Sequence, residues 1–386
     1  MKAWPKVALG ELLRRSDEAA VLDPAAEYHE VTIKLWGKGV LSRGMVRGSD
    51  VVSVRRVIRG NQLILSKIDA RNGAIGLVPP ELDGAIVSND FPSFEFRDSE
   101  RCDAAFMGWL VRSAPFVELC KAASEGTTNR VRIKEDRFLD QQIGLPPLSE
   151  QQAMVARLDA LAEKTREVDA HLDAVERDAE HLLALHFRDV IADTQLRPMA
   201  EVAPAVRRPV DIDIALRYRE VGARSFGKGL FVKPDFDGAE ATWQKPVWIM
   251  AGDLVLSNIK AWEGAIALAG HEHEGCIASH RYITCVPDRA IATAGFLAYY
   301  LLSDEGLEKV GLASPGTADR NRTLSLGNLG KIGVPIPALS AQQTFDRLRA
   351  DVAALKAKHA AIRRASAALI PATLERIFST EVPAHA

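Results

Sequence analysis

The sequence has 386 residues, a formal net charge of −2 and 47% hydrophobic residues. These values are typical of a globular protein with two or more domains and exclude a disordered chain. No apolar run approaches the about 20 residues of a membrane-spanning helix, and the first residues, MKAWPKVALGELL, lack the apolar core of a signal peptide. We therefore expect a cytoplasmic protein that does not enter a membrane.

The chain carries an internal duplication with a period of about 190 residues. LILSKIDARNGAIGLV at 63–78 matches LVLSNIKAWEGAIALA at 254–269, and PPLSEQQ at 146–152 matches PALSAQQ at 337–343. The matching words keep their order and spacing. The two halves are therefore expected to fold as homologous domains related by a pseudo-two-fold internal repeat.

Four segments are predicted in chain order. Residues 1–147 and 193–338 combine short apolar runs between glycine-rich turns with later helical patterns, which predicts a mostly antiparallel sheet and short helices in each. Residues 148–192 and 339–386 each predict one long helix, the second with a tail. The expected fold class is α+β: two mixed α/β domains separated by two long antiparallel coiled-coil helices.

Start signals precede both long helices. Ser149 with Gln152, and Ser340 with Gln343, match the capping box, in which the Ser and Gln side chains satisfy the first backbone amides. Residues spaced alternately three and four apart then predict a coiled-coil seam. We place that seam at Val155, Leu158, Ala162, Thr165, Leu172, Val175, Ala179 and Leu182 in the first helix, and at Phe345, Leu348, Val352, Leu355, His359, Ile362 and Leu369 in the second.

The two helices also differ in charge. Residues 150–189 hold ten acidic and five basic residues, whereas residues 341–369 hold two acidic and six basic ones. Opposite charge favours docking of one helix on the other. The alternative is that each helix packs separately on its own domain.

Motifs of catalysis are scarce. GARSFGKGL, at 222–230, resembles a phosphate-binding loop, but Gly229 stands where a Ser or Thr would hold Mg²⁺, and the first half repeats only GKG, at 37–39. A turn is the favoured interpretation and nucleotide hydrolysis the minor one. The His and Cys residues between His271 and His280 match no common zinc spacing, so no metal site is predicted.

Basic residues are unevenly distributed. Residues 31–71 carry nine Lys or Arg against two acidic residues, an excess that suits contacts with DNA phosphates. Solvated surface charge is the competing interpretation for any one of them. On charge and residue type, the candidate DNA-binding residues are Lys34, Lys38, Arg43, Arg47, Lys67, Arg71, Arg130, Arg224, Lys228, Lys233, Lys260, Arg281, Arg320, Asn321 and Arg322.

The whole chain resembles the specificity subunit of type I restriction-modification enzymes. The likeness rests on LPPLSEQQ and VPIPALSAQQ at the helix starts, GDLVLSNIKAWEGAIALA, and LLALHFRDVI and ALIPATLERIF at the helix ends, in duplicated order. It implies two target recognition domains, each reading one half of a bipartite, asymmetric sequence in double-stranded DNA. It also implies helices that dock two methyltransferase subunits, with restriction and translocase subunits joining. No recognition residue can be carried over by motif.

The resemblance implies a subunit without catalysis or cofactor of its own. S-adenosylmethionine, ATP and Mg²⁺ are then expected on the partner subunits. Helices of about 40 residues would span roughly 60 Å and set the gap between half-sites, so four residues inserted after Ala170 should widen it by about two base pairs. The remaining alternative is a coiled-coil scaffold that binds proteins but no DNA.

Overall fold

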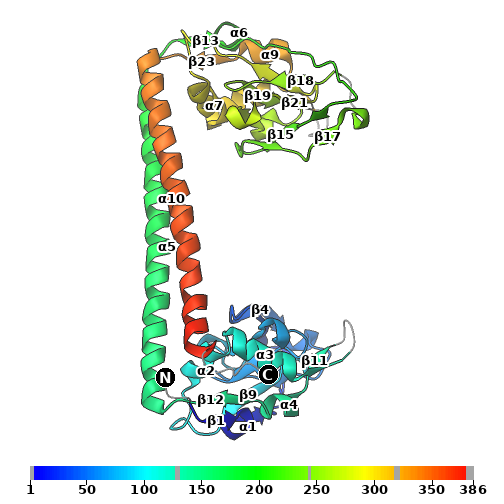
Figure 1. The fold of residues 1–386 in the computed structure, drawn as a ribbon, viewed down its shortest axis with the longest axis vertical. Helices are drawn as coiled ribbons and strands as arrows, with labels where there is room; N and C mark the ends of the chain where they lie inside the picture. The colour runs from blue at the N-terminus through cyan, green and yellow to red at the C-terminus, as the bar shows by residue number, and fades with distance from the viewer. Residues whose placement is uncertain (1–3, 127–130, 242–244, 317–321, 380–386) are drawn as a thin grey trace. The chain divides into compact units, whose positions relative to one another are not determined.

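The structure is a computed structural model that describes residues 4–126, 131–241, 245–316 and 322–379. The chain contains two long helices, α5 (Leu148–Ile191) and α10 (Leu339–Phe378) (Figure 1). The chain forms two compact units. Unit 1 comprises Met1–Leu172 and His359–Ala386, and unit 2 comprises Asp173–Lys358. Each unit therefore contains one mixed α/β domain and a part of each long helix, which confirms the expected α+β class.

The domain of unit 1 is built on two four-stranded sheets. One has the strand order β2-β9-β6-β7 and is antiparallel throughout, and the other has the order β4-β3-β8-β5 with one parallel pair, β3 and β8. Apolar residues such as Leu63 and Phe94 lie fully buried in these strands. The strands are β2 (Leu13–Ser16), β3 (Glu27–Ile33), β4 (Val40–Arg47), β5 (Arg56–Val57), β6 (Leu63–Leu65), β7 (Ile75–Leu77), β8 (Ile86–Val87) and β9 (Ser93–Phe96).

Short helices and two-stranded pairs complete this domain. The strand pairs are β1 (Lys6–Ala8) with β12 (Gln142–Gly144), and β10 (Ser124–Glu125) with β11 (Arg132–Ile133). The helices are α1 (Leu9–Leu12), α2 (Ala104–Leu110), α3 (Ala114–Ala122) and α4 (Glu135–Leu139), with 3-10 turns η1 (Gly48–Asp50), η2 (Ala70–Asn72) and η3 (Pro80–Leu82).

The domain of unit 2 repeats this plan with shorter strands. β19 (Leu254–Ser257) pairs with β20 (Ile266–Leu268) and β22 (Tyr282–Cys285), as β6 pairs with β7 and β9. The other pairs are β13 (Leu196–Pro198) with β23 (Gly333–Pro335), β14 (Arg217–Tyr218) with β17 (Phe236–Asp237), β15 (Val221–Ala223) with β16 (Leu230–Val232), and β18 (Val247–Ile249) with β21 (Cys276–Ala278). The helical segments are α6 (Met199–Val202), η5 (Gly238–Glu240), η6 (Ala261–Glu263), η7 (His271–His273), α7 (Ala294–Leu302), α8 (Asp304–Leu312) and α9 (Leu326–Lys331).

The long helices share a core with each domain. In unit 1, Leu158 of α5 joins Leu374 and Phe378 of α10 in the cluster that also contains the domain's buried residues. In unit 2, Phe187 of α5 lies 5.1 Å, between ring centroids, from Phe345 of α10. The start of α5 therefore meets the end of α10, and the end of α5 meets the start of α10. Within each unit, the two helix segments pack antiparallel against each other and against the domain of that unit.

The predicted seam is wrong at three positions. Leu182, Ile362 and Leu369 are 63%, 45% and 48% exposed, whereas Leu183 and Ser366 are buried. A straight helix has 3.6 residues per turn, so a strict alternation of three and four residues drifts off the buried face along a helix of this length.

The predicted capping boxes are also wrong. The carbonyl of Pro147 accepts the first helical bond, from the Gln151 amide at 3.0 Å, and that of Ala338 does the same for Gln342 at 3.2 Å. Both helices thus begin one residue before the serines, which lie in the first turn. The first glutamine of each QQ pair is instead fully buried and ties the helix start to its domain.

Candidate nucleic-acid interface

A six-residue turn with the same backbone occurs in both domains. In unit 1 it joins β3 to β4 across Lys34–Gly39, and the Lys34 amide donates to the Gly39 carbonyl at 2.9 Å. In unit 2 it joins β15 to β16, and the Arg224 amide donates to the Gly229 carbonyl at 3.0 Å. The repeated GKG word forms the second half of each turn. We call these the GKG turns.

Each GKG turn rests on the turn that follows the next buried strand. The amides of Trp36 and Gly37 donate to the carbonyls of Asn72 and Gly73, both at 3.0 Å. A Cβ at Gly73, whose φ is +77°, would lie only 3.1 Å from the Trp36 backbone. Glycine is required there because the backbones approach so closely, which explains part of the duplicated GAI word.

Unit 2 repeats this contact. The amides of Phe226 and Gly227 donate to the carbonyls of Glu263 and Gly264 at 2.8 and 2.9 Å. Gly264 has a φ of +80° and the same close approach, with a Cβ 3.3 Å from the Phe226 backbone. The GKG turn and the η2 or η6 turn therefore form one rigid surface in each domain.

Most of the predicted basic residues of unit 1 are exposed. Lys34, Lys38, Arg43 and Arg47 are exposed, and Arg71 is half-buried. Among the described residues none of these five forms an ion pair. Lys67 differs: its Nζ lies 2.7 Å from a carboxylate oxygen of Glu135. Lys67 is therefore already paired with a carboxylate of its own domain, and its contact with DNA stays a prediction.

Arg43 occupies an irregular position in the sheet. The pairing of β3 with β4 shifts between Glu30 and Val31, which face Gly44 and Ser42, so Arg43 is the extra residue of a β-bulge. Bulges redirect a side chain out of the regular alternation of a strand. The β-bulge therefore sets the direction in which Arg43 projects from the exposed strand β4.

The basic residues of unit 2 divide in the same way. Arg224, Lys228 and Arg281 are exposed and form no ion pair among the described residues. Lys233 and Lys260 are paired with Glu220 at 2.9 Å and Glu263 at 2.5 Å.

Trp262 lies between two of the predicted cations. The Lys260 ammonium lies 5.1 Å from the centroid of the Trp262 ring, and the Arg322 guanidinium lies 4.4 Å from it. Arg322 also donates to the Gly311 carbonyl at 3.0 Å, so both cations are partly committed to internal contacts.

Three predicted residues, Arg130, Arg320 and Asn321, lie outside the described part of the chain.

Sequence reasoning missed three residues of this surface. Trp36 and Phe226, at the tips of the GKG turns, are 71% and 74% exposed. Arg112, two residues after the end of α2, stacks on Trp109 at 4.3 Å and lines, with Lys38, a groove of about 350 Å³ that is otherwise lined by glycines and apolar residues. Burial lowers the pKa of the Arg112 guanidinium. The aromatic residue preceding GKG in both halves was a signal available in the sequence.

Nucleotide hydrolysis finds no support in the geometry. Gly222 lies in strand β15, where a Cβ would meet the Phe231 ring at 2.5 Å, and a strand, β16, follows the turn. A phosphate-binding loop would be followed by a helix whose N-terminus faces the phosphates. The phosphate-loop interpretation is therefore wrong. No group of three or more His, Cys, Asp or Glu residues suited to a metal ion occurs in the described part of the chain.

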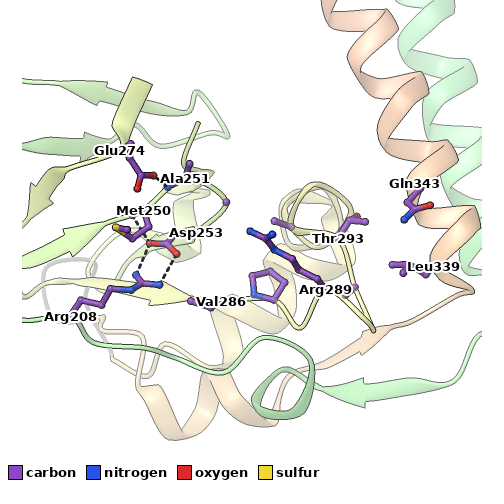
Figure 2. A pocket seen from close by; sticks show the side chains of 14 residues that line it. Arg208, Met250, Ala251, Asp253, Glu274, Val286, Arg289, Thr293, Leu339 and Gln343 are labelled. Carbon is purple, nitrogen blue, oxygen red and sulfur yellow. Dashed lines mark hydrogen bonds and ion pairs between the residues drawn. The ribbon is translucent and has the colours of Figure 1, made fainter. Parts of the chain in front are cut away.

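A polar pocket of about 620 Å³ lies in unit 2 (Figure 2). On one side of it Arg208 donates to both carboxylate oxygens of Asp253, at 2.8 and 3.1 Å, while Glu274 accepts from the Ala251 amide. Asp253 is 2% exposed. Arg208, Asp253 and Glu274 are therefore held by one another and by the backbone, and we do not include this pocket in the candidate interface.

Comparison by sequence finds no relative of this chain among the family descriptions and curated proteins. No protein-family description matches the sequence, and no curated protein matches it. None of the described helices is long and apolar enough to cross a membrane.

Solved structures match over nearly the whole chain. One is the HsdS subunit from Thermoanaerobacter tengcongensis, with a TM-score of 0.60, 22% identity, and 98% of this chain and 97% of that chain covered. Another is a chain from a type I restriction-modification system studied for its complex assembly and conformational transition, with a TM-score of 0.70, 22% identity and 98% of each chain covered. The chain thus has the two-domain, two-helix fold of type I restriction-modification specificity subunits.

Proposed function

We propose that this chain is the DNA-recognition subunit of a type I restriction-modification complex and has no catalytic activity of its own. The observation that carries the proposal is the duplicated surface of the GKG turn and its supporting turn. In both domains this surface presents exposed cations without a carboxylate partner among the described residues. Such cations suit phosphate contacts, which supply much of the affinity of DNA-binding proteins.

Duplication explains why the target would have two parts. Each domain carries its own version of the surface: Lys34 and Trp36 in unit 1 are replaced by Arg224 and Phe226 in unit 2, whereas the lysine of the GKG motif is the same in both. Two domains with the same backbone and different side chains read two different half-sites, which gives a bipartite, asymmetric target. The paired helices separate the half-sites and dock two methyltransferase subunits, and the restriction and translocase subunits join that complex.

The test is a genome-wide map of methylated adenine in the source cell, with and without this gene. The expected result is loss of one gapped, two-part methylation motif on deletion, with all other methylated positions retained. Reintroducing the gene should restore the motif. An unchanged map, together with no binding of any duplex by the chain assembled with its methyltransferase partner, would contradict the proposal.

Exchange of one domain gives a sharper second test. A chain in which residues 193–338 are replaced by a second copy of residues 1–147 should change only one half of the methylated motif. A change in both halves, or in neither, would show that the two domains do not read half-sites independently.

A further inference from the structure

The exposed rings at the tips of the two GKG turns share features that chance exposure does not explain. A single exposed aromatic residue is ordinary on a protein surface. Here Trp36 and Phe226 occupy equivalent positions in two copies that have diverged to different residues, yet both side chains remain large, aromatic and more than two-thirds exposed. The shared property is an aromatic ring in solvent.

Both rings are held on a backbone that large residues seldom adopt. The φ angles are +61° at Trp36 and +62° at Phe226, and the following glycines, Gly37 and Gly227, are both at +65°. Two consecutive positive φ values are those of a type I′ turn, whose first central residue is usually Asn, Asp or Gly. A bulky residue there costs about 1 kcal/mol or more, and such strain is typical of functional positions.

The backbone contacts fix where each ring is presented. Trp36 and Phe226 each donate their amide to the supporting turn, and the next glycine donates a second bond to it, so the tip is rigid. With the backbone held, only the two side-chain torsions of the ring remain to be ordered when it stacks on a partner. The turn therefore fixes the point from which the ring projects into solvent.

Charge identifies the partner. The Phe226 ring lies 5.7 Å from the Lys228 ammonium, and Arg224 is exposed at the base of the same turn. In unit 1, Lys34 and Lys38 flank Trp36, and Arg112 lines the adjoining groove with Lys38. Arg224 also stacks on the Phe231 ring at 4.6 Å, and none of these cations has a carboxylate partner among the described residues. An apolar ring beside such cations fits the base stack and phosphates of a nucleic acid better than an apolar protein surface.

We propose that Trp36 and Phe226 are stacking wedges: in each unit the ring inserts beside a base of the bound duplex and unstacks that base step. This inference rests on the proposed DNA-recognition function and adds specificity-determining residues to it. The cations of the same turn contact the flanking phosphates. The cost of unstacking differs among base steps, so the wedges contribute to sequence preference without hydrogen bonding to a base edge.

The test uses substitutions that remove the ring without straining the turn. Glycine tolerates positive φ, so Trp36→Gly and Phe226→Gly leave the backbone able to adopt the turn. Trp36→Phe and Phe226→Trp keep a ring. Matched controls remove an exposed apolar side chain elsewhere in the same unit: Val52→Ala, at a residue 99% exposed, and Ile214→Ala, at a residue 74% exposed.

Each variant is assembled with its methyltransferase partner and titrated with a duplex that carries the methylated target, with unstacked thymines probed by permanganate. Each glycine variant should bind about tenfold more weakly, the effect of losing one stacked base. It should also lose permanganate reactivity in one half-site only, with an unchanged salt slope and an undiminished melting temperature. The ring-retaining variants and the controls should match the wild type.

Three results would overturn the inference. Glycine variants with wild-type affinity and the wild-type permanganate pattern would remove the wedges while leaving DNA recognition intact. Glycine variants that bind DNA normally but no longer assemble with the methyltransferase subunit would make the rings a protein interface instead. A wild-type complex that binds no duplex at all would overturn the proposed function and the wedges together.

Discussion

Individual cations of this chain differ in how available they are to a ligand. Lys67, Lys233 and Lys260 each hold a carboxylate, whereas Arg43 and Arg47 project from β4 with no carboxylate partner among the described residues. A paired cation must lose its partner before it can neutralise a phosphate. The free cations are therefore the ones expected to set the electrostatic part of DNA affinity.

Replacing Arg43 and Arg47 together by alanine should weaken DNA binding and reduce its salt dependence. Each lost phosphate contact lowers the slope of log K against log salt by about 0.9, so the double variant should lose up to about 2. The slope is measured by titrating a duplex at several salt concentrations. The matched control is Arg132→Ala with Arg137→Ala, because those arginines are paired with Asp90 and Glu125. An unaltered slope in the Arg43 and Arg47 variant would remove both residues from the interface.

The four cysteines are all buried, and burial raises the pKa of Cys102, Cys120 and Cys285 to about 12 and that of Cys276 in the same direction. Only the thiolate is nucleophilic, so the folded chain should resist alkylation at pH 8. Labelling should rise about tenfold for each pH unit above that while the chain stays folded. Mass spectrometry of native and denatured samples measures it. Labelling of the native chain at the rate of a free thiol would contradict the burial of these side chains.

At the scale of elements, one glutamine joins each long helix to its domain. Gln342 Oε1 accepts from the amide of Thr293, the N-cap of α7, at 3.0 Å, and Nε2 donates to the carbonyls of Ile291 and Pro337 at 3.0 and 2.9 Å. Gln151 makes the equivalent three bonds in unit 1, to Asp103, Arg101 and Pro146. The start of each long helix is thus oriented by a buried polar contact with the start of a short one.

Gln342→Ala should destabilise unit 2 by about 3 kcal/mol. The substitution leaves one part-buried amide and two part-buried carbonyls without their partner, and each such loss costs on the order of 1 kcal/mol. The neighbouring Gln343→Ala is the matched control, because Gln343 is exposed and its loss should change stability by less than about 0.5 kcal/mol. Thermal unfolding followed by circular dichroism compares the two. Equal melting temperatures would show that the buried contact does not hold the helix.

The duplicated sequence motifs predicted the helices and strands better than they predicted the role of each residue. The QQ words correctly marked the starts of both helices, but helix-capping rules selected the second glutamine of each pair. The first one is buried because its partners, such as Thr293 and Ile291, lie about 50 residues earlier in the chain. A local pattern cannot indicate contacts at that separation. The same limit hid the carboxylates of Glu135 and Glu220 that occupy two of the predicted DNA ligands.

The sequence predicts the charge of the candidate surface but not its shape. Counting Lys and Arg found Lys34, Lys38 and Arg43, because charge is read directly from the sequence. The aromatic residue before each GKG motif could be seen in the sequence, but the positive φ and the exposure of Trp36 and Phe226 follow from the way the GKG turn rests on the turn at Gly73 or Gly264. Arg112 reaches the same groove from α2, so only the tertiary fold brings it to Lys38.

At the scale of the whole molecule, both long helices belong to both units. The division between the units cuts α5 after Leu172 and α10 after Lys358, and within each unit the helices share a core with one domain. The two domains are thus joined by continuous helices rather than by loops. Under the proposed function, helix length then sets the gap between the two half-sites.

Four residues inserted after Leu172 and four after Lys358 should lengthen both helices together and preserve their pairing within each unit. The insertion adds about 6 Å and rotates the helix by about 40° beyond a full turn. Two base pairs of DNA add about 7 Å and about 70°, so the methylated motif should gain a gap of two base pairs. Seven inserted residues add about 10 Å but return the helix to nearly its starting angle, whereas three base pairs turn DNA by about 100°. The seven-residue variant should therefore methylate poorly at any gap. A four-residue variant that keeps the wild-type gap would show that the helices do not measure the distance between half-sites.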